Sequence, residues 1–291
     1  MNMINAGSVH ILRKNIENIL KLSRISEANI ESNILISHFL HLSKEEIILK
    51  GQDIYPDKES LANIKIAINR RLNGEPISHI IGRREFYSIN FDVNEDVLDP
   101  RPDSEILIEE ALKIITDISS VKKVNILELG VGSGCLVLTL LKNVINSKAI
   151  AVDINPKSIV VAKKNAVSLG LDNRIKFIQS NWFNNLDKQE FDIIISNPPY
   201  IKSNDIINLQ KEVKDCEPLI ALDGGKDGLE CYRIIAANIN NFSHKKSFLI
   251  LEIGHNMEND VINIFKNYNF KFIKYARDLN SIIRCLIFSK E

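Results

Sequence analysis

Short apolar runs alternate with longer amphipathic stretches through the last two thirds of the chain. Near-continuous apolar strands separated by helices are typical of a parallel sheet that is covered on both faces. The pattern therefore predicts an α/β fold. Five such runs, dominated by Ile, Leu, Val and Phe, occupy residues 124–130, 148–154, 174–180, 191–196 and 247–253.

Helical periodicity fills most of the gaps between these runs, notably over residues 156–169 and 230–241. A further helix is expected over 106–118, before the first run. Two more strand-like runs, 270–276 and 281–289, follow each other closely near the C-terminus. A short connection favours antiparallel pairing, so we expect a mostly parallel sheet of seven strands with an antiparallel end.

The N-terminal part of the chain has a different pattern, in which apolar residues recur at helical spacing. Ser43 followed by Glu46 is typical of a capping box that begins a short helix. Asp57 can cap another helix, and Gly74 is placed to end it. We therefore predict a small helical bundle domain over residues 1–75.

Residues 76–101 differ from both neighbouring parts. Aromatic and β-branched residues partly alternate there with polar ones, which predicts a β-hairpin or an extended linker. The segment ends in two closely spaced prolines, Pro100 and Pro102, which stiffen the chain before the next helix. The second domain is then expected to cover residues 102–291.

Composition narrows the function classes. Lys plus Arg equals Asp plus Glu, so the formal net charge is zero, which argues against broad electrostatic capture of nucleic acid. Four cysteines lack paired spacing and suggest free thiols in a reducing compartment rather than disulfides or a metal site. No long apolar run indicates a signal peptide or a membrane span. We expect a cytoplasmic protein.

The first predicted strand leads into the loop ELGVGSG, in which Gly130, Gly132 and Gly134 alternate. Alternating glycines allow a sharp turn and a close approach to a ligand, although a tight turn alone is the alternative. Asp153 ends the next strand, where an acid can bond both hydroxyls of a ribose. Glu128 before the loop suits either a buried salt bridge or a cationic ligand. Together they fit a dinucleotide or S-adenosylmethionine, and the glycine spacing favours the latter.

The third strand is followed by Asn181 and Trp182. Their position suits contacts with the edge and the face of an adenine ring. Trp182 is also the only tryptophan of the chain, and a role as a packing anchor between domains is the alternative.

The fourth strand ends in Asn-Pro-Pro-Tyr, residues 197–200. A simple turn is one interpretation, and a rigid clamp for a planar –NH2 group is the other. The side-chain oxygen of Asn197 can accept one hydrogen of that group, and the carbonyl of Pro198, fixed by its ring, can accept the second. Tyr200 can lie against the planar group. The carboxyl ends of parallel strands share one edge, which favours the clamp beside the nucleotide loop.

These motifs together resemble the class I S-adenosylmethionine-dependent methyltransferases that modify amide or amino nitrogens, with a Rossmann-like sheet. Two substrate classes share such a clamp: adenine in nucleic acid and glutamine in protein. The segments GEPISHIIGRREF, RPDSE, GVGSG, NPPYI and LDGGKDGL resemble the PrmC/HemK family over nearly the whole chain. Its members methylate the N5 of the GGQ glutamine in peptide chain release factors.

The resemblance implies roles for particular residues. It implies that S-adenosylmethionine, which leaves as S-adenosylhomocysteine, contacts Glu128, Gly130, Val131, Gly132, Ser133, Gly134, Asp153, Asn181, Trp182 and Asn197. It implies that Asn197, Pro198, Pro199, Tyr200, Phe86 and Arg101 bind the glutamine, with Asn197, Pro198 and Tyr200 catalytic.

Several alternatives stay open. Phe86 and Arg101 line the substrate cleft in one interpretation, and serve in hinge packing and a surface salt bridge in the other. An N6-adenine methyltransferase of DNA or RNA is the second enzymatic hypothesis, and a non-catalytic S-adenosylmethionine-binding module is the third. We expect the bundle 1–75 to dock the release factor, a monomeric state, and no metal or direct nucleic-acid partner.

Overall fold

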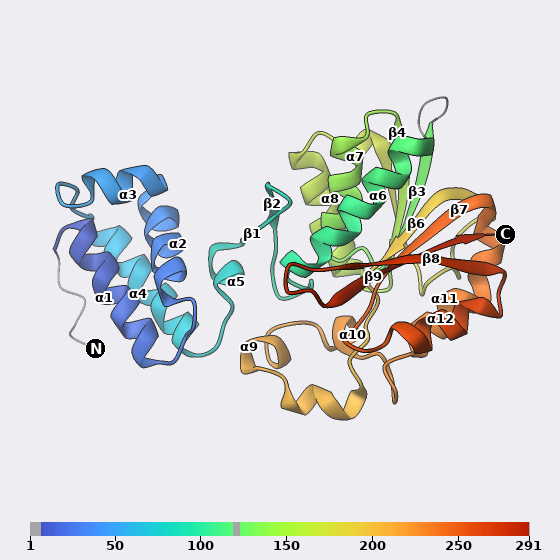
Figure 1. The fold of residues 1–291 in the computed structure, drawn as a ribbon. Helices are drawn as coiled ribbons and strands as arrows, with labels where there is room; N and C mark the ends of the chain where they lie inside the picture. The colour runs from blue at the N-terminus through green and yellow to red at the C-terminus, as the bar shows by residue number, and fades with distance from the viewer. Residues whose placement is uncertain (1–6, 119–122, 291) are drawn as a thin grey trace. The chain divides into compact units, whose positions relative to one another are not determined.

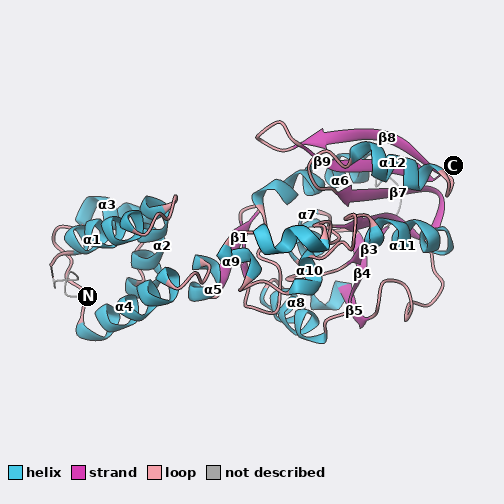
Figure 2. Cartoon of the chain, turned by 90° about the horizontal axis from the view of Figure 1, so that it is seen from below, coloured by secondary structure: helices cyan, strands magenta, loops and turns pink. Residues whose placement is uncertain are grey.

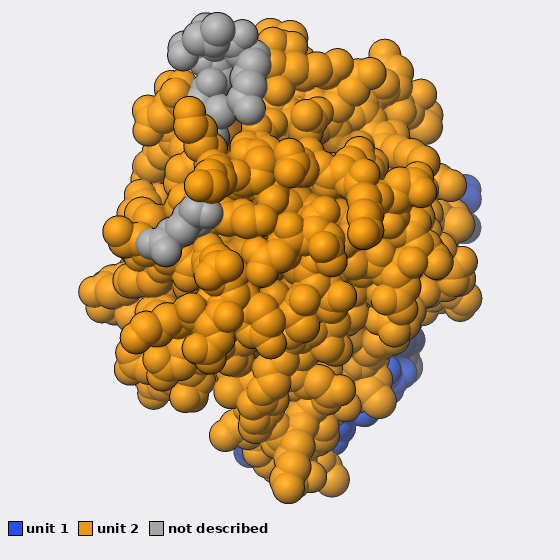
Figure 3. Space-filling model, turned by 90° about the vertical axis from the view of Figure 1, so that its right-hand side faces the viewer, with its two compact units in different colours: residues 1–82, 211–216 blue, residues 83–210, 217–291 orange. Residues whose placement is uncertain are grey.

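The computed structural model describes residues 7–118 and 123–290, and its chain forms two compact units (Figures 1 and 3). The first unit contains residues 1–82 and 211–216, and the second contains residues 83–210 and 217–291. The first six residues, which open the segment expected to lack a signal peptide, lie outside the described part. No helix in the described part is long and apolar enough to cross a membrane.

The first unit is a helical bundle around one apolar core. The predicted capping box is confirmed: Ser43 Oγ accepts from the Glu46 backbone N–H at 3.1 Å, and the Glu46 carboxylate accepts from the Ser43 N–H at 3.0 Å. Asp57 caps the next helix as predicted. The helices are α1 (Val9–Leu22), α2 (Ala28–Leu40), α3 (Lys44–Lys50), α4 (Lys58–Leu72), α5 (Ile77–Ile81) and α9 (Lys211–Lys214).

The end of α4 follows from Gly74, as predicted. Its φ of +100° is a left-handed conformation that glycine adopts without strain. Gly74 N–H then donates to the carbonyl of Arg71, and Glu75 N–H donates to the carbonyl of Arg70. These two bonds satisfy carbonyls that the helix end would otherwise leave unpaired.

A buried ion cluster joins distant parts of this unit. Arg71 on α4 is 8% exposed, and its Nε lies 2.7 Å from the carboxylate of Glu31 on α2. Its Nη2 lies 2.8 Å from Glu212 on α9. Residues 211–216, although far along the chain, therefore pack with the N-terminal helices.

The linker prediction is partly wrong. Residues 77–81 form the short helix α5 rather than an extended chain. The predicted hairpin is present, but it is confined to β1 (Arg83–Phe86) and β2 (Ile89–Asp92), which pair antiparallel. Tyr87 and Ser88 turn between them with positive φ angles of 50° and 58°, the conformation of a tight two-residue hairpin.

The second unit contains the predicted seven-stranded sheet, and Figure 2 draws the strands in magenta. The strand order is β5-β4-β3-β6-β7-β9-β8. The first five strands of this order pair parallel, and β9 pairs antiparallel with both β7 and β8. All predicted strands are confirmed, although β7 begins four residues before the predicted run. The strands are β3 (Val124–Leu129), β4 (Ser147–Asp153), β5 (Ile175–Gln179), β6 (Phe191–Ser196), β7 (Ser243–Glu252), β8 (Phe270–Arg277) and β9 (Ile283–Lys290).

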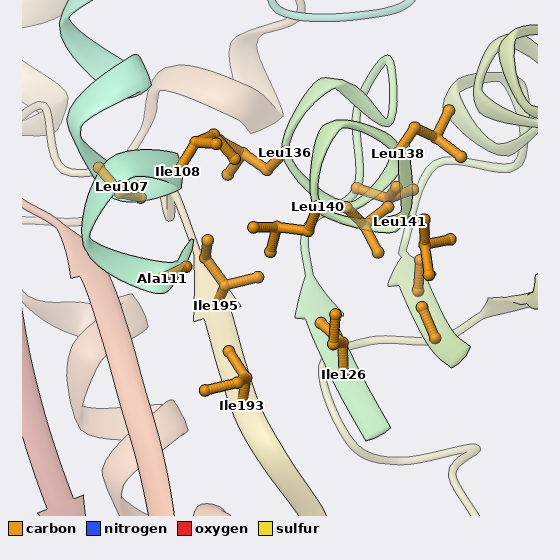
Figure 4. Packing of buried hydrophobic residues seen from close by; sticks show 14 of the residues in the cluster. Leu107, Ile108, Ala111, Ile126, Leu136, Leu138, Leu140, Leu141, Ile193 and Ile195 are labelled. Atoms are coloured by element: carbon orange, nitrogen blue, oxygen red, sulfur yellow. The ribbon is translucent and has the colours of Figure 1, made fainter. Parts of the chain in front are cut away.

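Successive residues of the central strands face opposite sides of the sheet, and both sides are buried. Ile126, Ile193 and Ile195 pack on one side with α6 and α7 (Figure 4). Leu127 and Ile194 pack on the other side with α11 and α12. The helices of this unit are α6 (Glu105–Ile118), α7 (Cys135–Asn143), α8 (Pro156–Ser168), α10 (Leu219–Leu222), α11 (Glu230–Asn238) and α12 (Glu258–Lys266).

The strand order fixes the place of the site. Strand β3 lies between β4, which follows it in sequence, and β6, which comes later. The chain therefore reverses its direction of sheet growth beside β3, and ligands of open α/β sheets bind outside the carboxyl ends of strands at such a point.

We expect the Arg71→Met variant to lose about 3–5 kcal/mol of unfolding free energy, because Glu31 would stay buried without its cation. Denaturation in urea, followed by circular dichroism, measures this. Arg70→Met on the same helix is the control: the ion pair of Arg70 with Glu75 is more exposed, and its loss should cost about 1 kcal/mol or less. Equal losses in the two variants would contradict a stabilising role for the buried cluster.

Candidate active site

A cavity of about 400 Å³ lies in the second unit, at the carboxyl edge of the sheet. Residues that follow β3, β4, β5 and β6 line it, as the strand order requires. Of the predicted site residues, those that line it are Arg101, Glu128, Gly130, Val131, Gly132, Ser133, Asp153, Asn181, Trp182, Asn197 and Pro199. Gly134, Pro198, Tyr200 and Phe86 are not part of the lining.

The glycine loop after β3 needs its glycines for conformation. Gly130 and Gly132 have φ angles of +75° and +52°, and a Cβ on either would meet no atom within 4 Å. Space is therefore open beside them, and the left-handed backbone is the constraint. Gly134 is the N-cap residue of α7 and does not line the cavity, and an added Cβ there would lie 3.0 Å from Leu138. Its contribution is close packing of the helix.

Asp153 connects this loop to β4. Its Oδ2 accepts the backbone N–H of Gly132 at 2.9 Å, and its Oδ1 accepts that of Asn155 at 2.9 Å. Each carboxylate oxygen has a second lone pair, so both can also accept hydroxyl protons from a ligand. Burial raises the pKa of Asp153 above its usual value, against the effect of these backbone bonds.

Glu128 is 1% exposed and still contributes to the cavity wall. Its Oε2 accepts the N–H of Val137 at 3.2 Å, which is its one protein hydrogen bond among the described residues. No lysine or arginine of the described chain pairs with it, so the buried salt bridge considered from the sequence is absent. Burial raises the pKa of this carboxyl well above its usual value. The arrangement suits a cationic ligand.

Trp182 both lines the cavity and packs against an apolar cluster of the same unit that includes Leu127, Ile194 and Tyr232. Its φ of +51° is a left-handed conformation that is uncommon for a bulky residue. Such strain is found more often where a side chain must point in a particular direction. Asn181 beside it is exposed.

The residues 197–200 begin where β6 ends. Asn197 Nδ2 donates to Ser104 Oγ at 3.3 Å, and Ser104 Oγ donates to Glu252 Oε2 at 2.5 Å. The Tyr200 hydroxyl donates to the other oxygen of Glu252 at 3.3 Å. Asn197 and Pro199 line the cavity, while Pro198 is buried and half-buried Tyr200 packs against the apolar cluster that contains Ile194 and Tyr232.

The segment LDGGKDGL, residues 222–229, supports the turn of residues 197–200. Ile201 N–H donates to the carbonyl of Leu222, and Gly224 N–H donates to the carbonyl of Ile201. A Cβ at Gly224 would lie 2.7 Å from Tyr200 Cα, closer than real Cβ atoms come, so only glycine fits there. The turn is therefore held from behind by backbone bonds and close contact.

Of the two residues Phe86 and Arg101, only Arg101 lines the cavity. Phe86 is 1% exposed and packs in the core, with its ring centroid 6.3 Å from that of Phe91. The structure thus supports packing rather than the substrate cleft for Phe86, because its ring has no surface left for a ligand. Arg101 lines the cavity, and its Nη2 lies 2.5 and 2.7 Å from the two carboxylate oxygens of Glu217.

Ser104 and Glu252 are site residues that the sequence interpretation missed. Glu252 ends β7 and is 2% exposed, and Ser104 ends the short 3-10 helix Pro102–Ser104. The signal for Glu252 was present, because an acid ending a buried strand of a parallel sheet lies at the same edge as the other site residues.

Two family models match parts of this chain. The PrmC N-terminal domain matches residues 12–82, and the methyltransferase small domain matches residues 103–214. The catalytic domain of hMettl16, solved with MAT2A 3'UTR hairpin 6, is similar in structure with a TM-score of 0.55 at 13% identity. That match covers 84% of this chain and 86% of the other, and it shows the shared fold.

Two curated relatives carry the family assignment. A bifunctional methyltransferase of Rickettsia prowazekii is 38% identical in an alignment of 289 positions, which covers 94% of this chain and 56% of the relative. The chain thus spans about half the length of such relatives. The release factor glutamine methyltransferase of Agrobacterium fabrum is 35% identical over 272 residues, 93% of each chain. The protein therefore belongs to the release factor glutamine methyltransferase family, and its second unit has the fold of the class I methyltransferases.

Proposed function

We propose that this protein transfers a methyl group from S-adenosylmethionine to the side-chain N5 of the glutamine in the GGQ motif of peptide chain release factors. The observation that carries the proposal is the Asn197 amide at the cavity wall, with its Nδ2 engaged by Ser104. Its Oδ1 accepts no hydrogen bond from the described residues and is left for a substrate –NH2.

The wall of the cavity fits the methyl donor. A volume of about 400 Å³ is within the range of small-molecule sites. Asp153 keeps free lone pairs for ribose hydroxyls, and Trp182 offers an aromatic face for a base. Glu128 places a buried carboxyl group at the wall, and no lysine or arginine of the described residues pairs with it, which suits the positively charged part of the donor. When bound, S-adenosylmethionine supplies an electrophilic methyl group on a sulfonium.

The turn Asn-Pro-Pro-Tyr orients the nitrogen that accepts the methyl group. An amide nitrogen is a poor nucleophile because its lone pair is delocalised into the carbonyl. Asn197 Oδ1 and the carbonyl of Pro198 each accept one N–H, which fixes the nitrogen and favours the charge that builds on it. Proline fixes the backbone φ, so the Pro198 carbonyl is preorganised. The Tyr200 ring supports the planar group from the side.

The proposal also includes the protein's partners, its oligomeric state and its location in the cell. The helical bundle of residues 1–75 docks the release factor, and Arg101 at the cavity wall contacts the substrate. The protein works as a monomer in the cytoplasm, without a metal and without direct contact to nucleic acid.

Methyl transfer tests the proposal directly. Labelled S-adenosylmethionine is offered with release factor, with its GGQ glutamine-to-alanine variant, and with adenine-rich duplex DNA, in separate reactions. Label on the intact release factor alone is expected. Label on DNA would move the substrate to adenine, and no label with intact donor binding would favour a non-catalytic binding module.

We expect Asn197→Ala to reduce kcat by about 100-fold or more, since one of two fixed acceptors for the amide hydrogens is lost. Donor affinity, measured by calorimetry, should fall much less. Asn238→Ala, at an exposed helix end, is the control and should keep wild-type rates. Wild-type turnover in Asn197→Ala would disprove the clamp.

The Glu128→Gln variant should have opposite effects on donor binding and on protein stability. The raised pKa of Glu128 means that the folded state holds this proton more tightly than the unfolded state does. Its stabilising contribution is therefore complete below the unfolded pKa of about 4.3 and is lost as pH rises through the folded pKa.

The glutamine in Glu128→Gln cannot ionise. The unfolding free energy of this variant, measured in urea, should therefore rise relative to that of the wild type as the pH increases from 5 to 8. Its affinity for S-adenosylmethionine should drop about tenfold or more, because a charged partner is lost. Glu109→Gln, at an exposed position, is the control for both measurements. An unchanged donor affinity would contradict the contact between Glu128 and the cation.

A further inference from the structure

Asn197, Ser104 and Glu252 are connected by hydrogen bonds, and the number of protons on each group fixes the direction of these bonds. An ionised carboxylate only accepts, so Glu252 takes the hydroxyl protons of both Ser104 and Tyr200. Ser104 has a single hydroxyl proton, and the 2.5 Å bond to Glu252 uses it. Toward Asn197, Ser104 Oγ can therefore only accept.

This leaves one orientation for the Asn197 amide. Its –NH2 must face Ser104, as the 3.3 Å contact has it, and its carbonyl oxygen must face away. The reversed amide would set two acceptors against each other at Ser104. It would also present donors to a substrate –NH2, which itself has only hydrogens to offer.

We propose that Ser104 and Glu252 are positioning residues, which fix the Asn197 side chain with its oxygen toward the substrate amide. The chain Glu252–Ser104–Asn197 is a relay of hydrogen-bond direction, and neither of its first two members touches the reacting atoms. This inference rests on the function proposed above, since it explains how the clamp comes to accept rather than donate.

The relay depends on the charge of Glu252. A protonated Glu252 becomes a donor to Ser104 Oγ, and the Ser104 proton is then free to point toward Asn197. Asn197 can then accept this hydrogen bond with its side-chain oxygen, and its –NH2 turns toward the substrate. Burial raises the pKa of Glu252 to about 7, with Arg284 and the bonds from Ser104 and Tyr200 acting against it. The clamp is therefore correctly oriented above this pH and disturbed below it.

Other ionisable groups surround this carboxyl. The short 3-10 helix contributes Asp103, strand β9 contributes Arg284 and Cys285, α7 contributes Cys135, and α11 contributes Tyr232. Arg284 pairs with Asp103 at 3.3 Å and with Asp278 at 3.2 Å. Burial raises the pKa of both thiols and of Tyr232, so these three groups stay neutral near pH 7. Of Glu252, the two thiols and Tyr232, Glu252 is thus the one expected to change charge near pH 7.

The kinetic test compares wild type with Ser104→Ala, Ser104→Thr and Glu252→Gln, using release factor and S-adenosylmethionine between pH 6 and pH 9. Ser104→Ala should lower kcat about tenfold, the effect of one lost hydrogen bond, with donor affinity unchanged. Ser104→Thr keeps the hydroxyl and should restore most of the rate. Wild-type kcat should rise through an inflection near pH 7, and Glu252→Gln should lose that inflection. Wild-type kcat in Ser104→Ala, or an unchanged pH profile in Glu252→Gln, would overturn the relay.

A second readout does not depend on methyl transfer. The side-chain amide of Asn197 gives nitrogen-15 NMR signals, which are assigned by their loss in Asn197→Ala. They should shift with a midpoint near pH 7 in the wild type and stay fixed in Ser104→Ala. The relay would be rejected if the chemical shifts of these signals did not change with pH in the wild type. It would also be rejected if they changed equally in Ser104→Ala. If these signals behave as expected while no release factor is methylated, the proposed substrate is wrong and the relay stands.

Discussion

The parallel pairing of β4, β3 and β6 is the constraint on which the rest of the second unit depends. It brings the ends of these strands to one edge, so Glu128, residues 130–133, Asp153, Asn197 and Pro199 line a single cavity although they are dispersed along the chain. The pairing is possible because both faces of the sheet are covered by helices. The apolar core thus does more than stabilise the fold, since it fixes where polar side chains can meet.

Two buried carboxyl groups at this edge, Glu128 and Glu252, are unfavourable for the fold taken alone. Burial raises the pKa of both, which is the sign that the folded state resists their ionisation. Perturbed carboxyl groups gather at functional sites because their charge is needed there. Glu128 lines the cavity and accepts one hydrogen bond from the described residues, whereas Glu252 accepts hydrogen bonds from Ser104 and Tyr200.

The chain also passes between its two units more often than a simple two-domain order requires. Residues 211–216 pack with the N-terminal helices, held by the contact of Glu212 with Arg71. The next residue, Glu217, belongs to the second unit and binds Arg101 at the cavity wall. Residues 211–216 of the first unit are therefore followed directly in the chain by Glu217, which pairs with Arg101 at the cavity wall.

Much of this protein follows from its sequence because the signals are local. The capping box at Ser43, the seven strand-like runs and the glycine loop each reflect preferences within a few neighbouring residues. Parallel strands then predict which loops meet, and most of the predicted site residues do line one cavity. The helix Ile77–Ile81 was missed because its β-branched residues favour strands, and packing overrode that preference.

Tertiary structure alone decided which side chains are partners. Ser104 and Glu252 lie 148 residues apart, and no local pattern links them. Phe86 is buried, and no lysine or arginine among the described residues pairs with Glu128; both facts likewise depend on what the rest of the fold places around each side chain. The physical reason is that a side chain's charge, exposure and hydrogen-bond direction are properties of its surroundings, and distant parts of the chain supply those surroundings.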